Sequence, residues 1–249
     1  MNVLFVTEED VFYIFEFFKA FFPLSREGSY KIKGISILPP FNKKSNWALA
    51  KQMYSFFGPF HFIVRGFLYV WKKLTGATIA NLSKNCGIPK IFTANVNDPQ
   101  FIQEIRKLDI DIIVSIAAPQ VFKPNMLRSA KYGCINSHSA LLPENRGMMP
   151  VFWSMYKGHR ELGVTVHYMD EKLDHGNIIK QECVERVAES WHEMTLKTKR
   201  MSARLIHETL EEIANGTIHS YPMPEGGSYQ TFPTFRDVKE FKRRGNRLF

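Results

Sequence analysis

Cysteine is scarce in this sequence, and the three that occur form no CxxC pair. They are Cys86, Cys134 and Cys183. Their odd number and wide spacing exclude a framework in which every cysteine is paired, and none has a histidine as its sequence neighbour, so cysteine catalysis lacks support. We expect core thiols in a reducing compartment, and hence a cytoplasmic protein.

Long apolar runs are missing too. No stretch of about 18 uncharged apolar residues occurs. The first residues, MNVLFVTEED, lack a basic segment followed by an apolar core and a small-residue cleavage site. These absences predict a soluble protein with no integral membrane segment.

The short motifs of several enzyme classes are also absent. Neither GxGxxG nor a Walker sequence follows the first predicted strand, which argues against a dinucleotide or ATP there. No serine lies in a GxSxG elbow. The pairs His192-Glu193 and His207-Glu208 lack the second histidine of HExxH, so we predict no metal.

The composition is typical of a globular protein. The 249 residues are 45% hydrophobic and 23% charged, which suits one domain with a sizeable core. The formal net charge of +9 permits nucleotides, phosphorylated or polyglutamylated small molecules, nucleic acid or an anionic membrane as partners. A basic surface that only keeps the protein soluble explains the charge equally well.

The order of the predicted elements indicates an α/β fold. Helix-like stretches separate a series of apolar runs that predict parallel strands, namely residues 1–7, 30–38, 109–117 and 132–136. Two alternating segments, 163–170 and 177–186, predict two half-buried strands before a long helix. We predict a Rossmann-like, mostly parallel twisted sheet with flanking helices, plus a short C-terminal extension.

The domain boundary is expected near Gly216, where that long helix ends. Its start is marked by the capping box Ser190 to Glu193. We predict a catalytic domain over residues 1–215 and a tail over 216–249 that carries a basic helix.

The segment INSHSALLPENRG, residues 135–147, places two polar side chains at the end of the fourth predicted strand. In an extended backbone, residues i and i+2 point to the same face, so Asn136 and His138 can converge on one substrate atom. Open sheets bind ligands at the carboxyl ends of their parallel strands. An amide and an imidazole placed there can stabilise an oxyanion in acyl transfer.

A carboxylate that orients the imidazole and takes up a proton is available on the loop after residues 163–170, from Asp170, Glu171 or Asp174. The alternative without catalysis is that His138 caps a loop and that Asp174 forms an Asx-turn before Gly176. Spacing alone leaves both interpretations open.

Two stretches, INSHSALLPENRGMMPVFW and GVTVHYMDEKLDHGNII, resemble the folate-dependent formyltransferases. The Asn-x-His pair, the LLPxxRG loop, the Gly-Val-Thr strand and the LDxG turn occur in that family's order, over roughly residues 110–186 and more loosely to 215. In the family, the amine of an acceptor attacks the formyl carbon of N10-formyltetrahydrofolate. The resemblance implies an enzyme of this kind.

The resemblance also implies roles for individual residues. Asn136 and His138 would polarise the formyl oxygen and hold the tetrahedral oxyanion, while Asp174 would keep His138 charged and help accept the amine proton. The residues expected around the formyl donor, N10-formyltetrahydrofolate, are Ser115, Ile116, Ala117, Ala118, Ala140, Leu141, Leu142, Pro143, Met169 and Asp170. The family commonly has Pro-Ser where this chain has Ser139-Ala140, which motivates the alternative of a folate-binding protein without turnover.

Features outside the motif favour one branch of the family. Methionyl-tRNA formyltransferases carry a further C-terminal barrel, which residues 217–249 are too few to build, so we expect no nucleic-acid partner. Glycinamide ribonucleotide formyltransferases bind phosphate with a Gly/Ser-rich loop after the first strand, where this chain has the acidic TEED. Formyltetrahydrofolate hydrolases place a regulatory domain before the core.

The remaining branch is the sugar N-formyltransferases, which act on nucleotide-linked amino sugars used in bacterial surface polysaccharides such as the O-antigen of lipopolysaccharide. We predict such an acceptor, with another small amine as the alternative. Arg146, Trp153 and Tyr156 are predicted to meet it, although core packing is the simpler role for Trp153.

Residues 46–74 are predicted to form a long helical segment that Gly58-Pro59 breaks into two pieces. Its aromatic-rich part, residues 53–74, is predicted to pack in the core or in a homodimer interface, with peripheral contact to a membrane surface as the alternative. Its cations Arg65, Lys72 and Lys73 are expected on a solvated helix face rather than at a diphosphate.

Overall fold

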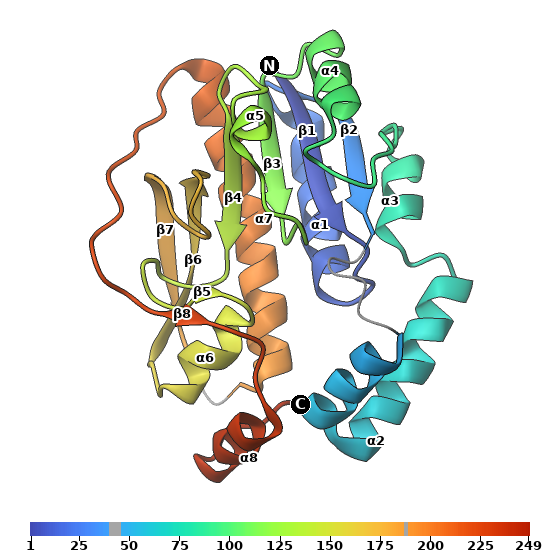
Figure 1. Ribbon diagram of the computed structural model, residues 1–249, viewed down its shortest axis with the longest axis vertical. Coiled ribbons are helices and arrows are strands. Elements are labelled where there is room, and N and C mark those ends of the chain that lie inside the picture. Colours follow the sequence, from blue (N-terminus) through green and yellow to red (C-terminus); the bar gives the residue numbers. More distant parts are fainter. Residues whose placement is uncertain (40–45, 187–188) are drawn as a thin grey trace.

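A mixed, six-stranded sheet runs through the centre of the protein (Figure 1). The computed structural model describes residues 1–39, 46–186 and 189–249. The strands lie in the order β2 (Lys31–Leu38), β1 (Asn2–Glu8), β3 (Ile112–Ile116), β4 (Cys134–His138), β6 (Glu161–Tyr168) and β7 (Ile178–Glu185). The first four are parallel, whereas β6 is antiparallel to β4 and β7 is antiparallel to β6. The predicted Rossmann-like α/β fold with a mostly parallel sheet is confirmed.

Helices cover both faces of this sheet. α1 (Tyr13–Leu24), α3 (Ile79–Asn85) and α7 (Trp191–Asn215) pack on one face, and α4 (Pro99–Lys107) and α5 (Pro124–Leu127) pack on the other. In β1, Val3 and Phe5 point to the first face while Leu4 and Val6 point to the second, and all four are fully buried. This burial explains why a central parallel strand is apolar without alternation.

The C-terminal extension returns to the core. β8 (Tyr229–Gln230) pairs in parallel with β5 (Arg146–Gly147), and α8 (Phe235–Arg243) follows. Phe241 of α8 is fully buried, and its ring stacks on Phe152 of α6 (Pro150–Tyr156) with the ring centres 4.5 Å apart. The helix predicted in the tail is therefore present, and its apolar side docks on the sheet domain.

The long helix α2 (Asn46–Leu74) is broken where the sequence predicts. Gly58 has φ 76° and ψ 168°, and Pro59 follows it, so two helical pieces meet at a kink. Phe56, in the first piece, is buried against Phe152 and Trp191. Core packing, one of the roles predicted for this segment, is thus found before the kink, whereas the second piece exposes most of its large apolar side chains.

The three cysteines are free thiols. Cys134 is buried in β4, as predicted. The prediction of a core position is wrong for Cys183, which is exposed because it lies on β7, the last strand of the sheet, where half-buried and exposed residues alternate.

Two ionisable side chains influence each other at the end of β1. Burial raises the pKa of Glu8 to about 7, and the negative charge of Asp10 adds to the rise while the positive charge of Lys199 on α7 opposes it. Burial also lowers the pKa of Lys199. The carboxyl and the amine are therefore both easier to neutralise than in water.

We expect the variant Glu8→Gln to flatten the pH dependence of stability. Folded Glu8 holds its proton up to about pH 7, whereas the unfolded chain releases it near pH 4.5, so the free energy of unfolding falls as pH rises through this window. Glu8→Gln has no proton to lose at this position, so it should be more stable than the wild type above pH 7, by about 3 kcal/mol. Urea unfolding on both sides of the window measures the difference, with the exposed Glu104→Gln on α4 as the control. Equal pH slopes in wild type and Glu8→Gln would contradict the raised pKa.

Candidate active site

Strand β4 carries Asn136 and His138 in extended backbone. It ends at His138, two residues later than predicted. On one side Asn136 is paired with Ser115 of β3, and on the other it is paired with His167 of β6. β4 is the last of the parallel strands, so its carboxyl end lies where the sheet changes from parallel to antiparallel pairing.

Asp174 lies between Asn136 and His138. Its Oδ1 is 3.4 Å from Asn136 Nδ2 and 3.5 Å from His138 Nδ1. Its Oδ2 accepts a hydrogen bond of 2.7 Å from the backbone N–H of Gly147. The three side chains of the expected triad are therefore brought together, and both nitrogens converge on one oxygen atom, which here belongs to the carboxylate.

The loop after β6 holds Asp174 with φ 45°, in the left-handed region. The Asx-turn considered from the sequence for Asp174 is made instead by Asp170, whose Oδ1 accepts a hydrogen bond of 2.8 Å from the N–H of Lys172. The other oxygen of Asp170 forms a very short contact with His175 Nδ1. Two carboxylates of one loop thus have separate tasks, and Asp174 is the one that faces the strand end.

His138 is 6% exposed and has an oxygen atom opposite each ring nitrogen. Its Nε2 lies 2.8 Å from the carbonyl oxygen of Asn145, to which it donates. Its Nδ1 faces Oδ1 of Asp174 at 3.5 Å. The side chain therefore anchors the loop after β4 and also faces the candidate acid or base, so the loop contact is present and the catalytic role stays a prediction.

His167 is a member of the site that we did not predict. It is 1% exposed, and its Nε2 lies 3.2 Å from Asn136 Nδ2. Its Nδ1 faces the carbonyl oxygens of Tyr168 and His175 at 2.8 and 3.2 Å, which assigns the ring proton to Nδ1 and leaves Nε2 as the acceptor. Burial lowers the pKa of His167, which favours this neutral form.

This neutral imidazole fixes the orientation of the Asn136 amide, because it accepts only from the nitrogen end. A signal was available in the sequence. His167 lies in the middle of the predicted strand 163–170, close to Val164 and Val166, and a polar side chain that is buried in such a strand needs a hydrogen-bond partner. The sequence does not say that the partner is Asn136.

We expect His167→Leu to lower kcat about tenfold, with little change in the affinity for the folate, because Asn136 loses the acceptor that orients it. Steady-state kinetics and folate titration separate the two effects. His167→Gln, which can still accept a hydrogen bond, should recover part of the loss. Equal losses in both variants would contradict a positioning role.

The residues predicted around the folate lie at three chain segments next to the triad. Ser115 and Ile116 are buried at the end of β3, and Ala117 follows with φ 50°. Ala118 and Met169 pack against the same apolar cluster, although one follows β3 and the other follows β6. Ala118 and Met169 therefore lie on the same face of the sheet, just after the ends of the two strands that flank β4.

The third segment, residues 140–143, is held by hydrogen bonds to side chains of β6 and β7. The hydroxyl of Thr165 donates to the carbonyl of Ala140 at 2.7 Å and accepts from the N–H of Leu142 at 3.0 Å. Gln181 Nε2 donates to the carbonyl of Leu142 at 2.7 Å. The backbone groups of Ala140 and Leu142 are thus hydrogen-bonded to side chains of β6 and β7, so this loop is held in one conformation and forms a wall of the site.

The three residues predicted to meet an acceptor have different surroundings. Arg146 precedes Gly147, which binds Asp174, and its Nε is buried with no partner among the described residues. Trp153 and Tyr156 face the tail instead. The indole N–H of Trp153 donates to the carbonyl of Thr231 at 2.9 Å, and the guanidinium of Arg244 lies 4.5 Å from the centre of the Tyr156 ring.

Within the part of the chain that the structure describes, no group of three His, Cys, Asp or Glu side chains is arranged to hold a metal ion. What the site contains is an amide, two imidazoles and a carboxylate around the end of β4. Such a set can donate hydrogen bonds to a developing oxyanion and accept a proton.

Comparison with known proteins gives a family match. A family described as formyl transferase matches residues 71–210. The methionyl-tRNA formyltransferase of Pelotomaculum thermopropionicum is 33% identical over 162 residues, which cover 64% of this chain and 51% of that protein. That of Citrifermentans bemidjiense is 38% identical over 133 residues, or 53% of this chain and 42% of that protein. The chain thus spans about half the length of the curated relatives it matches.

Solved structures share the fold at low sequence identity. A sugar N-formyltransferase from Shewanella sp. FDAARGOS_354 has a TM-score of 0.62 at 18% identity and covers 98% of this chain and 87% of its own. A phosphoribosylglycinamide formyltransferase from Bacillus halodurans also has a TM-score of 0.62 at 18% identity, with 86% and 95% coverage. A 4-N formyltransferase from Francisella tularensis has a TM-score of 0.58 at 20% identity, with 96% and 86% coverage.

Proposed function

Because this chain belongs to the formyl transferase family, we propose that it transfers a formyl group from N10-formyltetrahydrofolate to the amino group of a nucleotide-linked amino sugar. The observation that carries the proposal is the convergence of Asn136 Nδ2 and His138 Nδ1 on one oxygen atom, at 3.4 and 3.5 Å. That atom is Asp174 Oδ1, and a formyl oxygen bound beside it would lie within reach of both nitrogens. These separations are longer than good hydrogen bonds, as is common for catalytic groups before substrate binds.

The residues around the triad fit a folate. The small and apolar side chains of Ala118 and Met169 offer a surface for a flat ring, and the wall at Leu142 is already rigid. When bound there, the folate supplies the formyl group. The protein's part is to orient the formyl oxygen with Asn136 and His138 and to receive the proton of the amine at Asp174.

An anionic acceptor is supported by Arg146. Its guanidinium has a buried Nε without a partner in the described residues, and its backbone adjoins the Gly147 N–H that holds Asp174. A guanidinium binds phosphate with paired hydrogen bonds, so a nucleotide-linked sugar would place its diphosphate within reach of the catalytic loop. Trp153 and Tyr156, which we also predict at the acceptor, would contribute after some movement of the tail.

Methionyl-tRNA is the second candidate acceptor. The curated relatives at 33% and 38% identity are named methionyl-tRNA formyltransferases, and the net charge of +9 suits a nucleic acid. For the sugar, the supporting observation is that the Shewanella sugar N-formyltransferase shares its fold with 98% of this chain, tail included.

Mass spectrometry of candidate acceptors tests the proposal. The protein is incubated with N10-formyltetrahydrofolate and either a panel of nucleotide-linked 3- and 4-amino sugars or methionyl-tRNA. A gain of one formyl group on a sugar, absent with Asp174→Asn, supports the proposed acceptor. If only methionyl-tRNA were formylated, the proposed sugar acceptor would be wrong and methionyl-tRNA would take its place. Binding of the folate without any formylated product would favour a binding protein without turnover.

A further inference from the structure

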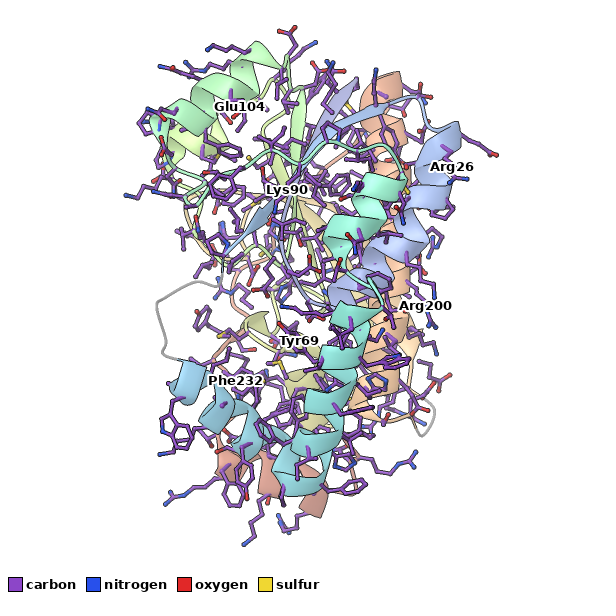
Figure 2. The ribbon with its side chains drawn as sticks, turned by 90° about the vertical axis from the view of Figure 1, so that its right-hand side faces the viewer. Arg26, Tyr69, Lys90, Glu104, Arg200 and Phe232 are labelled. Carbon is purple, nitrogen blue, oxygen red and sulfur yellow. The ribbon has the colours of Figure 1, made fainter. Side chains whose placement is uncertain are left out.

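The second piece of α2, residues 59–74, turns its apolar side chains away from the protein. The exposed fractions of its large apolar residues are 70% for Phe60, 70% for Ile63, 68% for Phe67, 54% for Val70, 56% for Trp71 and 80% for Leu74. They recur every three or four positions, so they lie on one face of the helix. Figure 2 shows α2 along one side of the lower half of the molecule, where Tyr69 is labelled.

The opposite face of this piece holds the helix to the protein, and it does so with cations. Arg65 is only 9% exposed, and its guanidinium lies 3.9 Å from the centre of the Phe12 ring. Lys72 Nζ lies 5.3 Å from the centre of the Phe15 ring. A helix on a water-facing surface normally buries its apolar face, and here the arrangement is reversed. The prediction that these cations lie on a solvated face is wrong for Arg65.

The chain end reinforces this orientation. The ring of Phe249 stacks on His61 with the ring centres 4.6 Å apart, and it also contacts Trp191 at the start of α7. The helix is therefore fixed with its apolar face outward. No described residue covers that face, and a continuous apolar surface of this kind on a soluble protein marks an interaction site.

The charged side chains near the apolar face are mainly positive. Residues 46–74 contain no aspartate or glutamate, and Lys51 and Lys73 are exposed. α8 lies beside α2 at the same end of the molecule (Figure 1). Its exposed cations include Arg236, Lys239 and Lys242, whereas its two acidic residues, Asp237 and Glu240, are half-buried. The surface thus combines aromatic and aliphatic side chains with a mainly basic border.

We propose that the outward face of residues 59–74, together with α8, docks on the surface of an anionic phospholipid bilayer. Aromatic and aliphatic side chains enter the boundary between headgroups and acyl chains, while the surrounding cations attract the anionic headgroups. None of the described helices is long and apolar enough to cross a bilayer, which suits a helix lying in its surface.

A second copy of this chain is a less suitable occupant. Two-fold pairing places the same patch of each copy against the other, so the basic border and α8 of one copy would meet those of its partner. Like charges at close range oppose such pairing, whereas an anionic membrane neutralises them.

Vesicle flotation tests the proposal with the full chain at low salt. Vesicles of phosphatidylcholine alone are compared with vesicles that also contain phosphatidylglycerol. We expect the protein to float with the anionic vesicles, and the double variant Phe67→Ser, Trp71→Ser to lose about tenfold or more in affinity. Phe92→Ser is the matched control, because Phe92 is 78% exposed but lies outside α2.

Analytical ultracentrifugation and thermal unfolding of the same variants complete the test. Failure of the wild type to bind anionic vesicles would overturn the proposal, and so would equal binding by the folded double variant. A dimer that dissociates in the double variant, without vesicle binding, would assign the face to a second copy. Vesicle binding requires no turnover, so its outcome is separate from that of the formyl-transfer assay.

Discussion

Replacing Asp174 by Asn is expected to lower kcat/KM for formyl transfer by about a thousandfold, while the dissociation constant of the folate changes only a few-fold. The carboxylate is the group to which Asn136 and His138 both point, and it can receive a proton as the amine is acylated. An asparagine presents either a carbonyl or an amino group there and accepts no proton. Loss of the carboxylate should therefore destabilise the transition state more than it weakens the binding of the folate.

Asp174 also makes a structural contact, so the experiment must separate a loss of catalysis from a loss of that contact. Its Oδ2 holds the N–H of Gly147 at 2.7 Å, so the loop after β6 and the loop after β4 are tied together. Loss of this hydrogen bond should lower the unfolding temperature and weaken folate binding, and thermal unfolding and folate titration measure these two effects. Glu171→Gln, an exposed change on the same loop, is the matched control and should retain full activity. Equal loss of folate affinity and of kcat in Asp174→Asn would contradict a catalytic role.

The second large effect is expected for His138→Gln, which should lower kcat by about two to three orders of magnitude. A glutamine can still donate a hydrogen bond to the carbonyl of Asn145, but it has no imidazole nitrogen opposite Asp174. The substitution therefore preserves the loop anchor and removes the imidazole that we propose to stabilise an oxyanion.

Steady-state kinetics with the acceptor identified by mass spectrometry measures this effect. His219→Gln, at an exposed position after α7, controls for the loss of an imidazole elsewhere. If His138→Gln kept its activity but unfolded at lower temperature, His138 would be an anchor of the loop and the catalytic assignment would fail.

The central strands and the polar residues at their ends could be predicted from sequence patterns alone. Apolar runs predicted β1, β3 and β4 because a strand buried on both faces has no room for polar residues. The i, i+2 spacing predicted that Asn136 and His138 share a face, which depends only on backbone geometry. The resemblance to the formyltransferases then selected Asp174 from three acidic residues of one loop.

Contacts between distant segments were beyond such patterns. His167 reaches Asn136 only because β6 pairs antiparallel with β4 in one register, and a shift by one residue would turn the side chain away. Trp153 and Tyr156 follow the catalytic loop in sequence, but tertiary packing sets them against the tail through Thr231 and Arg244.

The sequence by itself determined the α/β class, the kink at Gly58 and the family, and it predicted the residues of the triad, because these follow from local geometry, periodicity and short motifs. Only the tertiary structure decided which way α2 faces. Its aromatic composition is compatible with a core, an interface or a membrane surface. The choice depends on Phe12 and Phe249, which lie far away in sequence and bind Arg65 and His61 on the cationic side of the helix.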